Sequence, residues 1–203
     1  KCGMDPLDFR TLNASQEGTP QTVGPAFKRI GFVETLDAIR QSDHYKSKLS
    51  GPNQGRGVAS GFWFNVGMQS SATVNIHSDG TVSVVTGSVD IGGTRAAQAM
   101  IVAEVLGADI NDVRPIVADT DSIGHTDPTA GSRTAFATGW AVYDAAHDAL
   151  RQLKERVAKT WEKKPEEVAF ANGLFSPVSG NGVKPMTIKQ LAPRLARTGG
   201  PIV

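Results

Sequence analysis

The feature that most constrains this chain is a strand, a helix and a second strand that follow one another between residues 81 and 118. Residues 81–86 alternate apolar and polar side chains, residues 94–106 suit a helix that Gly107 ends, and residues 113–118 form another apolar run. These lengths are typical of a crossover connection, in which the two strands run parallel in one sheet. The pattern therefore predicts a βαβ unit.

A hairpin precedes this unit in the sequence. Residues 72–77 alternate in polarity, the turn Ser78-Asp79-Gly80 follows, and the chain returns through residues 81–87. Because the returning strand is also the first strand of the crossover, the sheet contains both antiparallel and parallel pairs. The expected fold class is α/β (mixed α+β), with a mixed sheet packed by helices.

Further elements are expected on both sides of this unit, from apolar spacing, turn residues and helix caps. They are a helix over residues 5–13, a helix from 32 to between 42 and 45, a strand over 58–66, a long helix after 132, a hairpin around 172–173 and a helix N-capped by Thr187. The consecutive aromatic residues Phe62, Trp63 and Phe64 are interpreted as core residues. The long helix has one apolar face, formed by Phe136, Val142, Ala146, Leu150, Leu153, Val157 and Trp161.

The composition excludes several classes of partner. The 21 basic and 20 acidic residues give a net charge of +1, which creates no global field that would attract nucleic acid or an anionic membrane. No segment approaches the roughly 20 apolar residues of a membrane span. The single cysteine, Cys2, excludes an internal disulfide or a multi-cysteine metal site. We expect a cytoplasmic protein with neither a nucleic-acid nor a membrane partner.

Both ends of the sequence indicate an internal fragment. The first residue is Lys1 rather than methionine, and the last five residues, Gly-Gly-Pro-Ile-Val, place two apolar residues after a turn with nothing beyond them to pair with. We expect a helical and loop entry segment over residues 1–50 and a partial domain over residues 51–203, truncated at both termini.

The first candidate binding site is the loop over residues 88–95, between a predicted strand and a helix. Ligands of crossover sheets gather at the carboxyl ends of strands. The pair Gly92-Gly93 would let a ligand approach the backbone, and free N–H groups at the start of the helix, near Thr94 and Arg95, would attract an anion.

The second candidate is the loop that precedes the long helix. It combines hydroxyl groups, a flexible glycine and a cation in one turn, through Thr129, Ala130, Gly131, Ser132, Arg133 and Thr134. Since both loops follow strands of one crossover sheet, we expect them to form a paired site for a phosphate or another polyanion.

Each loop also has a purely structural interpretation. A Gly-Gly pair is often only a tight turn, and a hydroxyl residue at the start of a helix is most often a simple N-cap. Taken singly, Arg95 and Arg133 are interpreted as surface or salt-bridge residues, and His125 as an exposed side chain. Three aspartates lack the spacing of a calcium loop and indicate a solvated turn rather than a metal cluster, namely Asp119, Asp121 and Asp127.

The sequence resembles the molybdopterin-binding part of the xanthine dehydrogenase and aldehyde oxidase family, which includes the large subunits of enzymes similar to aerobic carbon monoxide dehydrogenase. Four segments carry the resemblance in family order: GMDPLDFRTLN (3–13), GRGVASGFWFNVG (55–67), TVSVVTGSVDIGGTRAAQAMIVAEVLG (81–107) and VRPIVADTDSIGHTDPTAGSRTAFATGWAV (113–142). Either glycine motif alone would be a weak signal, whereas four segments in order are specific.

The resemblance implies that residues 51–203 are part of a molybdopterin-binding domain whose two loops hold the cofactor. Carried over by position, the cofactor-binding residues are Gly92, Gly93, Thr94 and Arg95 in the first loop, and Thr129, Ala130, Gly131, Ser132 and Thr134 in the second. Many relatives have Gly-Gln-Gly in the first loop, so the contact made by that glutamine is not carried over. Ser60 stands where purine-oxidising relatives have a stacking phenylalanine, which argues against xanthine as the substrate.

The resemblance further implies a molybdenum hydroxylase that oxidises an aldehyde or a heterocycle with oxygen derived from water. Its molybdenum–molybdopterin cofactor would be of the cytosine dinucleotide form, and partner subunits or domains of the oligomeric enzyme would carry [2Fe-2S] clusters and FAD. The family's glutamate base would lie outside this fragment, so no catalytic residue or protein metal ligand is assigned. The alternative is a non-catalytic module that binds a nucleotide or phosphate.

Overall fold

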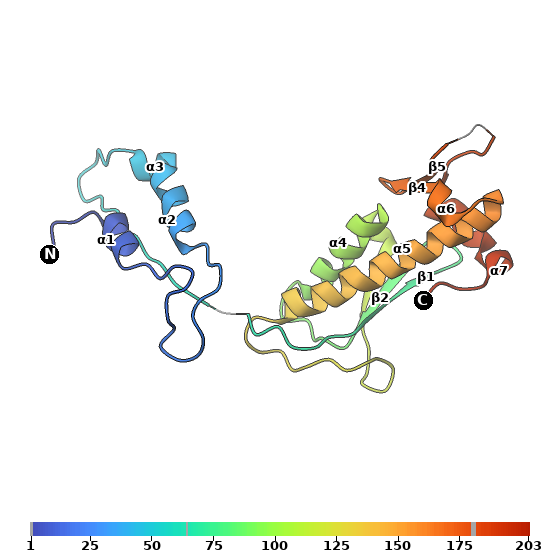
Figure 1. Cartoon of the computed structure of the whole chain (residues 1–203), viewed down its shortest axis with the longest axis horizontal. Coiled ribbons are helices and arrows are strands. Elements are labelled where there is room, and N and C mark those ends of the chain that lie inside the picture. The colour runs from blue at the N-terminus through green and yellow to red at the C-terminus, as the bar shows by residue number, and fades with distance from the viewer. Residues whose placement is uncertain (1, 64, 180–181) are drawn as a thin grey trace. The chain divides into compact units, whose positions relative to one another are not determined.

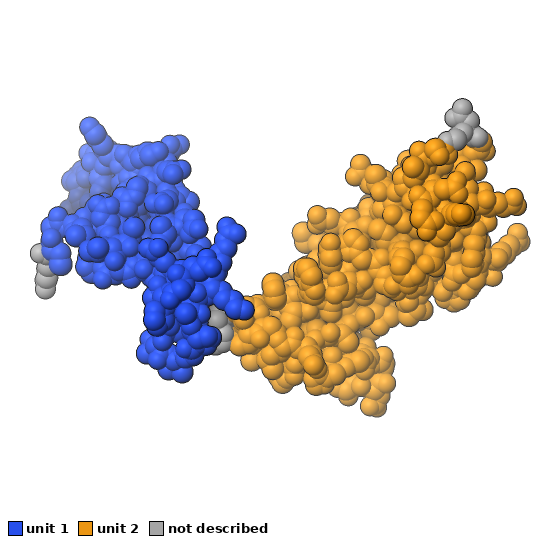
Figure 2. Space-filling view, in the orientation of Figure 1, with its two compact units in different colours: residues 1–62 blue, residues 63–203 orange. Residues whose placement is uncertain are grey.

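The computed structural model describes residues 2–63, 65–179 and 182–203, and these form two compact units. Unit 1 spans Lys1–Phe62 and unit 2 spans Trp63–Val203 (Figure 2). The division therefore falls after Phe62, whereas the sequence led us to expect a boundary after residue 50. Among the described residues, no helix combines the length and the apolar character that crossing a membrane requires.

The described residues of unit 1 form three short helices joined by loops (Figure 1). Asp5 caps the first helix by accepting the N–H of Leu7 at 2.8 Å, and it also accepts the hydroxyl of Tyr45. The first two helices pack together, and Leu7 and Leu36 are buried. The two helices predicted for this part are confirmed, with a third after them: α1 (Pro6–Leu12), α2 (Phe32–Gln41) and α3 (Asp43–Lys46).

Unit 2 is built around the predicted mixed sheet. Its strand order is β1-β2-β3, from β1 (Ala72–Ile76), β2 (Val82–Thr86) and β3 (Val113–Val117). The β1–β2 pair is antiparallel, with Ala72 opposite Thr86, and the β2–β3 pair is parallel, with Val82 opposite Val113. Both the hairpin and the βαβ crossover are therefore confirmed.

The helices α4 (Thr94–Leu106) and α5 (Gly139–Trp161) cover one face of this sheet (Figure 1). α4 crosses over between β2 and β3, and α5 continues from the π-helical turn η2 (Thr134–Thr138). α4 packs on β3, α5 packs on β1, and the two helices pack against each other. The core between helices and sheet includes Val74, Val82, Val84, Val102, Leu106, Val142, Ala146, Leu153 and Val157.

The apolar face predicted for the long helix is confirmed except at its start. Val142, Leu153 and Val157 are fully buried, but 63% of Phe136 is exposed. Phe136 lies within η2, where hydrogen bonds skip one more residue than in an α-helix and each side chain is rotated away from the α-helical face. The prediction that Phe136 shares this face is therefore wrong.

The strand predicted over residues 58–66 is absent from the described part of that segment, residues 58–63 and 65–66. The division between the units falls within it, and no neighbouring strand pairs with its described residues. Phe62 and Trp63 are 69% and 72% exposed, so their interpretation as core residues is wrong. Phe64 lies outside the described residues.

The C-terminal part of unit 2 adds a small sheet and short helices. The hairpin predicted around Asn172-Gly173 is confirmed, and both turn residues have positive φ, of 49° and 76°. Thr187 is confirmed as an N-cap that accepts the N–H of Gln190. The sheet order is β4-β5-β6, from β4 (Val168–Ala171), β5 (Leu174–Pro177) and β6 (Met186–Thr187), and the helices are α6 (Ile188–Leu191), η4 (Ala192–Arg194) and α7 (Leu195–Thr198).

Near the end of the sequence, Ile202 returns to the central sheet. It is fully buried, and its carbonyl oxygen accepts the N–H of Ile76 at 3.1 Å. Ile202 therefore pairs with β1, which precedes it in the sequence.

The helix cap at Gly107 generates a prediction about stability. Gly107 has the expected left-handed conformation, with φ 54°, and a Cβ there would lie 2.1 Å from the backbone nitrogen of Gly173. Gly107→Ala should lower the free energy of unfolding by about 2–5 kcal/mol, of which about 1–2 is backbone strain and about 1–3 is overpacking. Urea unfolding measures this loss.

Gly200→Ala is the matched control for Gly107→Ala. Gly200 also has a positive φ, of 87°, but a Cβ there meets no atom within 4 Å. This variant should therefore lose only the strain component, about 1–2 kcal/mol. Equal losses in the two variants would contradict a packing role for Gly107.

Candidate functional site

The first loop lies between β2 and α4, and its glycine pair is open to solvent. Gly92 and Gly93 have φ values of 113° and 82°, which favour glycine, and an added Cβ would meet no atom within 4 Å at either position. Arg95 is exposed, as expected. The backbone of this loop can therefore be approached closely from outside.

An unpredicted residue, Asp90, already binds the N–H groups of this loop. One carboxylate oxygen accepts the N–H of Gly92 at 3.0 Å, the N–H of Thr94 at 3.1 Å and the hydroxyl of Thr94 at 2.9 Å. The other oxygen accepts Nε of Arg95 at 2.9 Å. The expectation of free N–H groups is therefore wrong for Gly92 and Thr94, because an internal carboxylate takes the place of an external anion.

These contacts stabilise the charged form of Asp90. Its pKa is held well below the ordinary value of 3.8, first by the hydrogen bond from Arg95 and then by those from Gly92 and Thr94. Arg95 is thus the salt-bridge residue that the sequence predicts. Thr94 is buried, and its hydroxyl is directed at Asp90 rather than at solvent.

The second loop turns sharply before η2. Gly131 and Ser132 have φ values of 54° and 55°, so two consecutive residues adopt the left-handed conformation. Only glycine fits at position 131, because a Cβ there would lie 2.6 Å from the side chain of Val66. The carbonyl oxygens of Gly131 and Ser132 accept the N–H of Val66 at 3.1 Å and the side-chain amide of Asn65 at 2.8 Å.

The hydroxyl groups of the second loop divide into two exposed and one buried. Thr129 and Ser132 are exposed, whereas Thr134 is 2% exposed and donates to the hydroxyl of Thr129 at 3.1 Å. Ala130 is also exposed, next to Gly131. Thr129 and Ser132 can therefore contact a ligand directly. The buried Thr134 orients the hydroxyl of Thr129 by donating a hydrogen bond to it.

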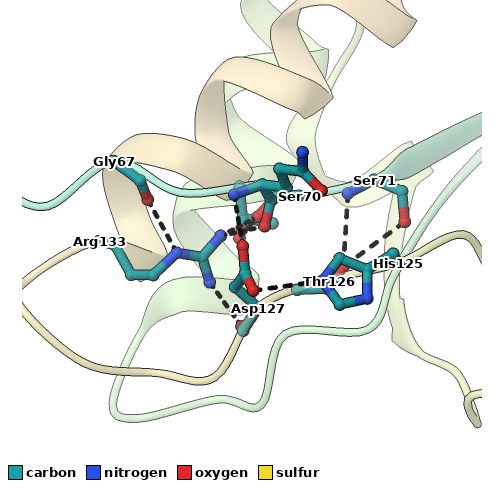
Figure 3. A network of polar contacts seen from close by, with 9 residues as sticks. Gly67, Ser70, Ser71, His125, Thr126, Asp127 and Arg133 are labelled. Atoms are coloured by element: carbon teal, nitrogen blue, oxygen red, sulfur yellow. Dashed lines mark hydrogen bonds and ion pairs between the residues drawn. The ribbon is translucent and has the colours of Figure 1, made fainter.

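Arg133 is the main departure from the site that the sequence predicts. Its side chain is fully buried, so the interpretation as a surface or salt-bridge residue is wrong. The guanidinium donates to the carbonyl oxygens of Gly67 at 2.9 Å, Asp127 at 2.7 Å and Gln69 at 2.6 Å, and to the hydroxyl of Ser70 (Figure 3). A planar group with several donors suits such a set of separate acceptors.

Two aspartates of the β3–η2 loop accept hydrogen bonds, one from within the loop and one also from Gln69. Asp119 accepts the N–H of Asp121 at 3.1 Å and the hydroxyl of Ser122 at 2.6 Å. Asp127 accepts the N–H of Gln69 at 2.7 Å and pairs with the exposed His125 at 3.2 Å (Figure 3). The pKa of Asp127 is lowered by these two contacts and, more weakly, by the charge of Arg133. Among the described residues, no cluster could hold a metal ion.

Hydroxyl groups connect the two loops, and those of Ser88 and Thr138 are buried. Thr138, in η2, bonds to Ser88 at the start of the first loop at 2.6 Å and to Ser70 at 3.0 Å. Ser70 in turn accepts from Arg133. The link between the loops thus runs through residues that were not among the predicted site residues.

A groove of about 480 Å³ lies beside this network. Phe136 and Trp140 form part of its wall, and both are more than half exposed. The remaining lining residues are Gly67, Met68, Gln69, Ser70, His125, Ala137, Ala141 and Asp144. The groove therefore borders Gly67, Gln69 and Ser70, three of the residues that accept hydrogen bonds from Arg133.

Sequence reasoning missed Asp90, Thr138 and the segment over residues 65–70 as parts of the site. Asp90 had a local signal, because an aspartate two residues before a glycine commonly accepts a nearby backbone N–H. Thr138 and the 65–70 segment had none, since their contacts join residues more than fifty positions apart or depend on the π-helical turn.

Comparison with known proteins places these loops in a family. The model of the molybdopterin cofactor-binding domain matches residues 35–202. The molybdenum-binding subunit PaoC of aldehyde oxidoreductase from Escherichia coli (strain K12) is 30% identical over 199 residues, which is 94% of this chain and 26% of that protein. The chain therefore spans about a quarter of the length of this relative.

Solved structures agree with this match. Carbon monoxide dehydrogenase from Oligotropha carboxidovorans superposes with a TM-score of 0.57 at 27% identity, over 63% of this chain and 16% of that one. Quinoline 2-oxidoreductase from Pseudomonas putida 86 superposes with a TM-score of 0.53 at 27% identity, over 62% and 16% of the two chains. From the match to most of its length, this chain belongs to the molybdopterin cofactor-binding domain family.

Proposed function

We propose that this chain holds the molybdenum cofactor of a molybdenum hydroxylase through its two exposed loops. The observation that carries the proposal is that the family match covers both loops, and that both present open backbone or exposed hydroxyls on the same crossover sheet. The proposed cofactor-binding residues are Gly92, Gly93, Thr94, Arg95, Thr129, Ala130, Gly131, Ser132 and Thr134. A stand-alone module for a nucleotide or phosphate finds no support among the relatives.

The donors of the two loops fit a phosphate-bearing ligand. Phosphate oxygens accept hydrogen bonds from hydroxyl and N–H groups, and the exposed hydroxyls of Thr129 and Ser132 supply such donors. The open faces of Gly92 and Gly93 leave room for close backbone contact. In this assignment, Thr94 and Thr134 shape their loops from within, and Arg95 balances the charge of Asp90 so that an anion is not repelled.

The bound cofactor would supply two-electron redox chemistry, and this chain would supply binding, orientation and electrostatics. We assign no catalytic residue and no protein ligand of the metal here. The relatives named above are an aldehyde oxidoreductase subunit, a carbon monoxide dehydrogenase and a quinoline oxidoreductase. An aldehyde or a nitrogen heterocycle, oxidised with water-derived oxygen, is accordingly the proposed substrate class.

The finer features of the enzyme are proposed from the same family membership. The cofactor would be the cytosine dinucleotide form, and [2Fe-2S] clusters and FAD would be carried by partner subunits or domains of an oligomeric, cytoplasmic enzyme. PaoC is itself named as a subunit, which supports division of the redox groups among chains.

Cofactor content tests the proposed function. The full-length gene product, expressed in a host that makes the molybdenum cofactor, should contain molybdenum and a pterin that releases a cytidine nucleotide. Elemental mass spectrometry and fluorescence of the oxidised pterin measure both. A protein matured in that host but free of molybdenum and pterin would contradict the proposal.

The joint change of Thr129 and Ser132 to alanine tests the second loop. Loss of even one hydrogen bond to a charged group is worth about 1.5–3 kcal/mol, so cofactor retention should fall at least about tenfold. Ser78→Ala is the control, because Ser78 is an exposed residue in the turn at the opposite end of β2 and should leave retention unchanged. Equal retention in all three proteins would remove the two hydroxyls from the site.

The pH dependence of stability tests the role of Asp90 in the first loop. Its folded pKa is lowered, so its stabilising effect is complete above its ordinary pKa and is lost as the pH falls through the lowered value. Asp90→Asn should therefore reduce stability at pH 7, and its difference from wild type should shrink below about pH 4. Arg95→Gln should act in the same direction, since Arg95 is the largest cause of the shift. Urea midpoints between pH 7 and pH 2 measure this, and a difference that stays constant would refute it.

A further inference from the structure

Arg133 is a buried cation whose hydrogen-bond acceptors are all neutral. Three are backbone carbonyl oxygens and one is the hydroxyl of Ser70. Among the described residues, no carboxylate forms an ion pair with it, and the oxygens of Asp127 accept instead from Gln69 and His125. Burying a charge without a contacting counter-charge is costly, so the position calls for a reason beyond packing.

The burial of Arg133 determines how the second loop is presented. Gly131 and Ser132 turn the chain through the left-handed region immediately before it, so Ser132 is exposed while Arg133 is fully buried. The guanidinium then joins the segment over residues 67–70 to the carbonyl of Asp127, just before the loop begins (Figure 3). Arg133 thus holds both sides of the loop that exposes Thr129 and Ser132.

The same side chain reaches the first loop through hydroxyl groups. Arg133 donates to Ser70, Ser70 bonds to Thr138, and Thr138 bonds to Ser88. Ser88 is buried and begins the segment that leads to Gly92 and Gly93. A displacement of the guanidinium would therefore change the hydrogen bonds that hold both loops.

We propose that Arg133 is the positioning residue of the cofactor site. It holds both loops in their binding conformation before the cofactor arrives. The inference rests on the proposed function of the loops, and it adds a residue that touches no ligand itself. Because preorganised groups lose less freedom on binding, such a residue raises affinity without a contact of its own.

Hydrogen exchange of the cofactor-free protein tests this positioning role. The full-length gene product is made in a host unable to synthesise the cofactor, as wild type and as Arg133→Met. In Arg133→Met, amide protection over residues 65–71 and 127–134 should fall at least about tenfold, because several bonds to a charged donor are lost together. Protein from a cofactor-producing host should also lose cofactor at least about ten times faster.

Arg156→Met is the matched control. Arg156 lies on α5 and donates to the backbone carbonyls of Thr198 and Gly199, at 2.8 Å and 3.1 Å, away from both loops. It should lower the melting temperature without changing loop exchange or cofactor release. If Arg156→Met loosens the loops as much as Arg133→Met does, Arg133 is only a structural residue and the inference is overturned.

Two further variants keep the test decisive if Arg133→Met fails to fold. Ser70→Ala removes one acceptor and leaves the charge, so it should lower loop protection less than Arg133→Met. Arg133→Lys keeps the charge but is unable to reach the separate acceptors, so loop protection should stay low. Full protection in both variants would overturn the inference. If wild type binds no cofactor, the proposed function fails, while the exchange experiment still decides whether Arg133 orders the loops.

Discussion

The arrangement of unit 2 around its site depends on one buried guanidinium. Arg133 donates to three backbone carbonyls and one hydroxyl, and these acceptors come from segments that are 6 to 66 positions away in the sequence. Hydrogen bonds to a charged group are worth about 1.5–3 kcal/mol each. Together they can offset the strain of two consecutive left-handed residues, of which the non-glycine Ser132 costs about 1–3 kcal/mol.

In each of the two loops, one charged side chain satisfies backbone hydrogen-bonding groups, and the two side chains have opposite charges. In the first loop, the carboxylate of Asp90 gathers N–H groups and is neutralised by Arg95, so the loop is complete without a ligand. In the second, the cation of Arg133 gathers carbonyl groups and meets no carboxylate among the described residues. Its charge acts on the nearby carboxylate of Asp127, whose pKa it helps to lower without forming an ion pair.

The sequence predicted the parts of the fold that depend on local patterns. The hairpin at Asn172-Gly173, the cap at Gly107 and the parallel pairing of β2 with β3 follow from turn residues and element lengths. The positions of the two loops followed in turn, because the loops after β2 and β3 belong to one crossover sheet. The prediction that Phe136 lies on the buried helix face failed because the π-helical turn changes the helical period. We found no pattern in the sequence that predicts this turn.

The parts of the site that were not predicted depend on partners distant in the sequence. A serine followed by an arginine near the start of a helix is typical of an N-cap beside a surface charge. Both interpretations use only residues that are neighbours in the sequence. Whether Arg133 is buried depends on the carbonyl oxygens of Gly67 and Gln69, which lie in an irregular stretch just after the segment expected as a strand. Because no strand among the described residues pairs with this stretch, its carbonyl oxygens can accept from Arg133. Arg133 thus satisfies backbone carbonyl groups that no strand ladder uses, and it joins them to the second loop.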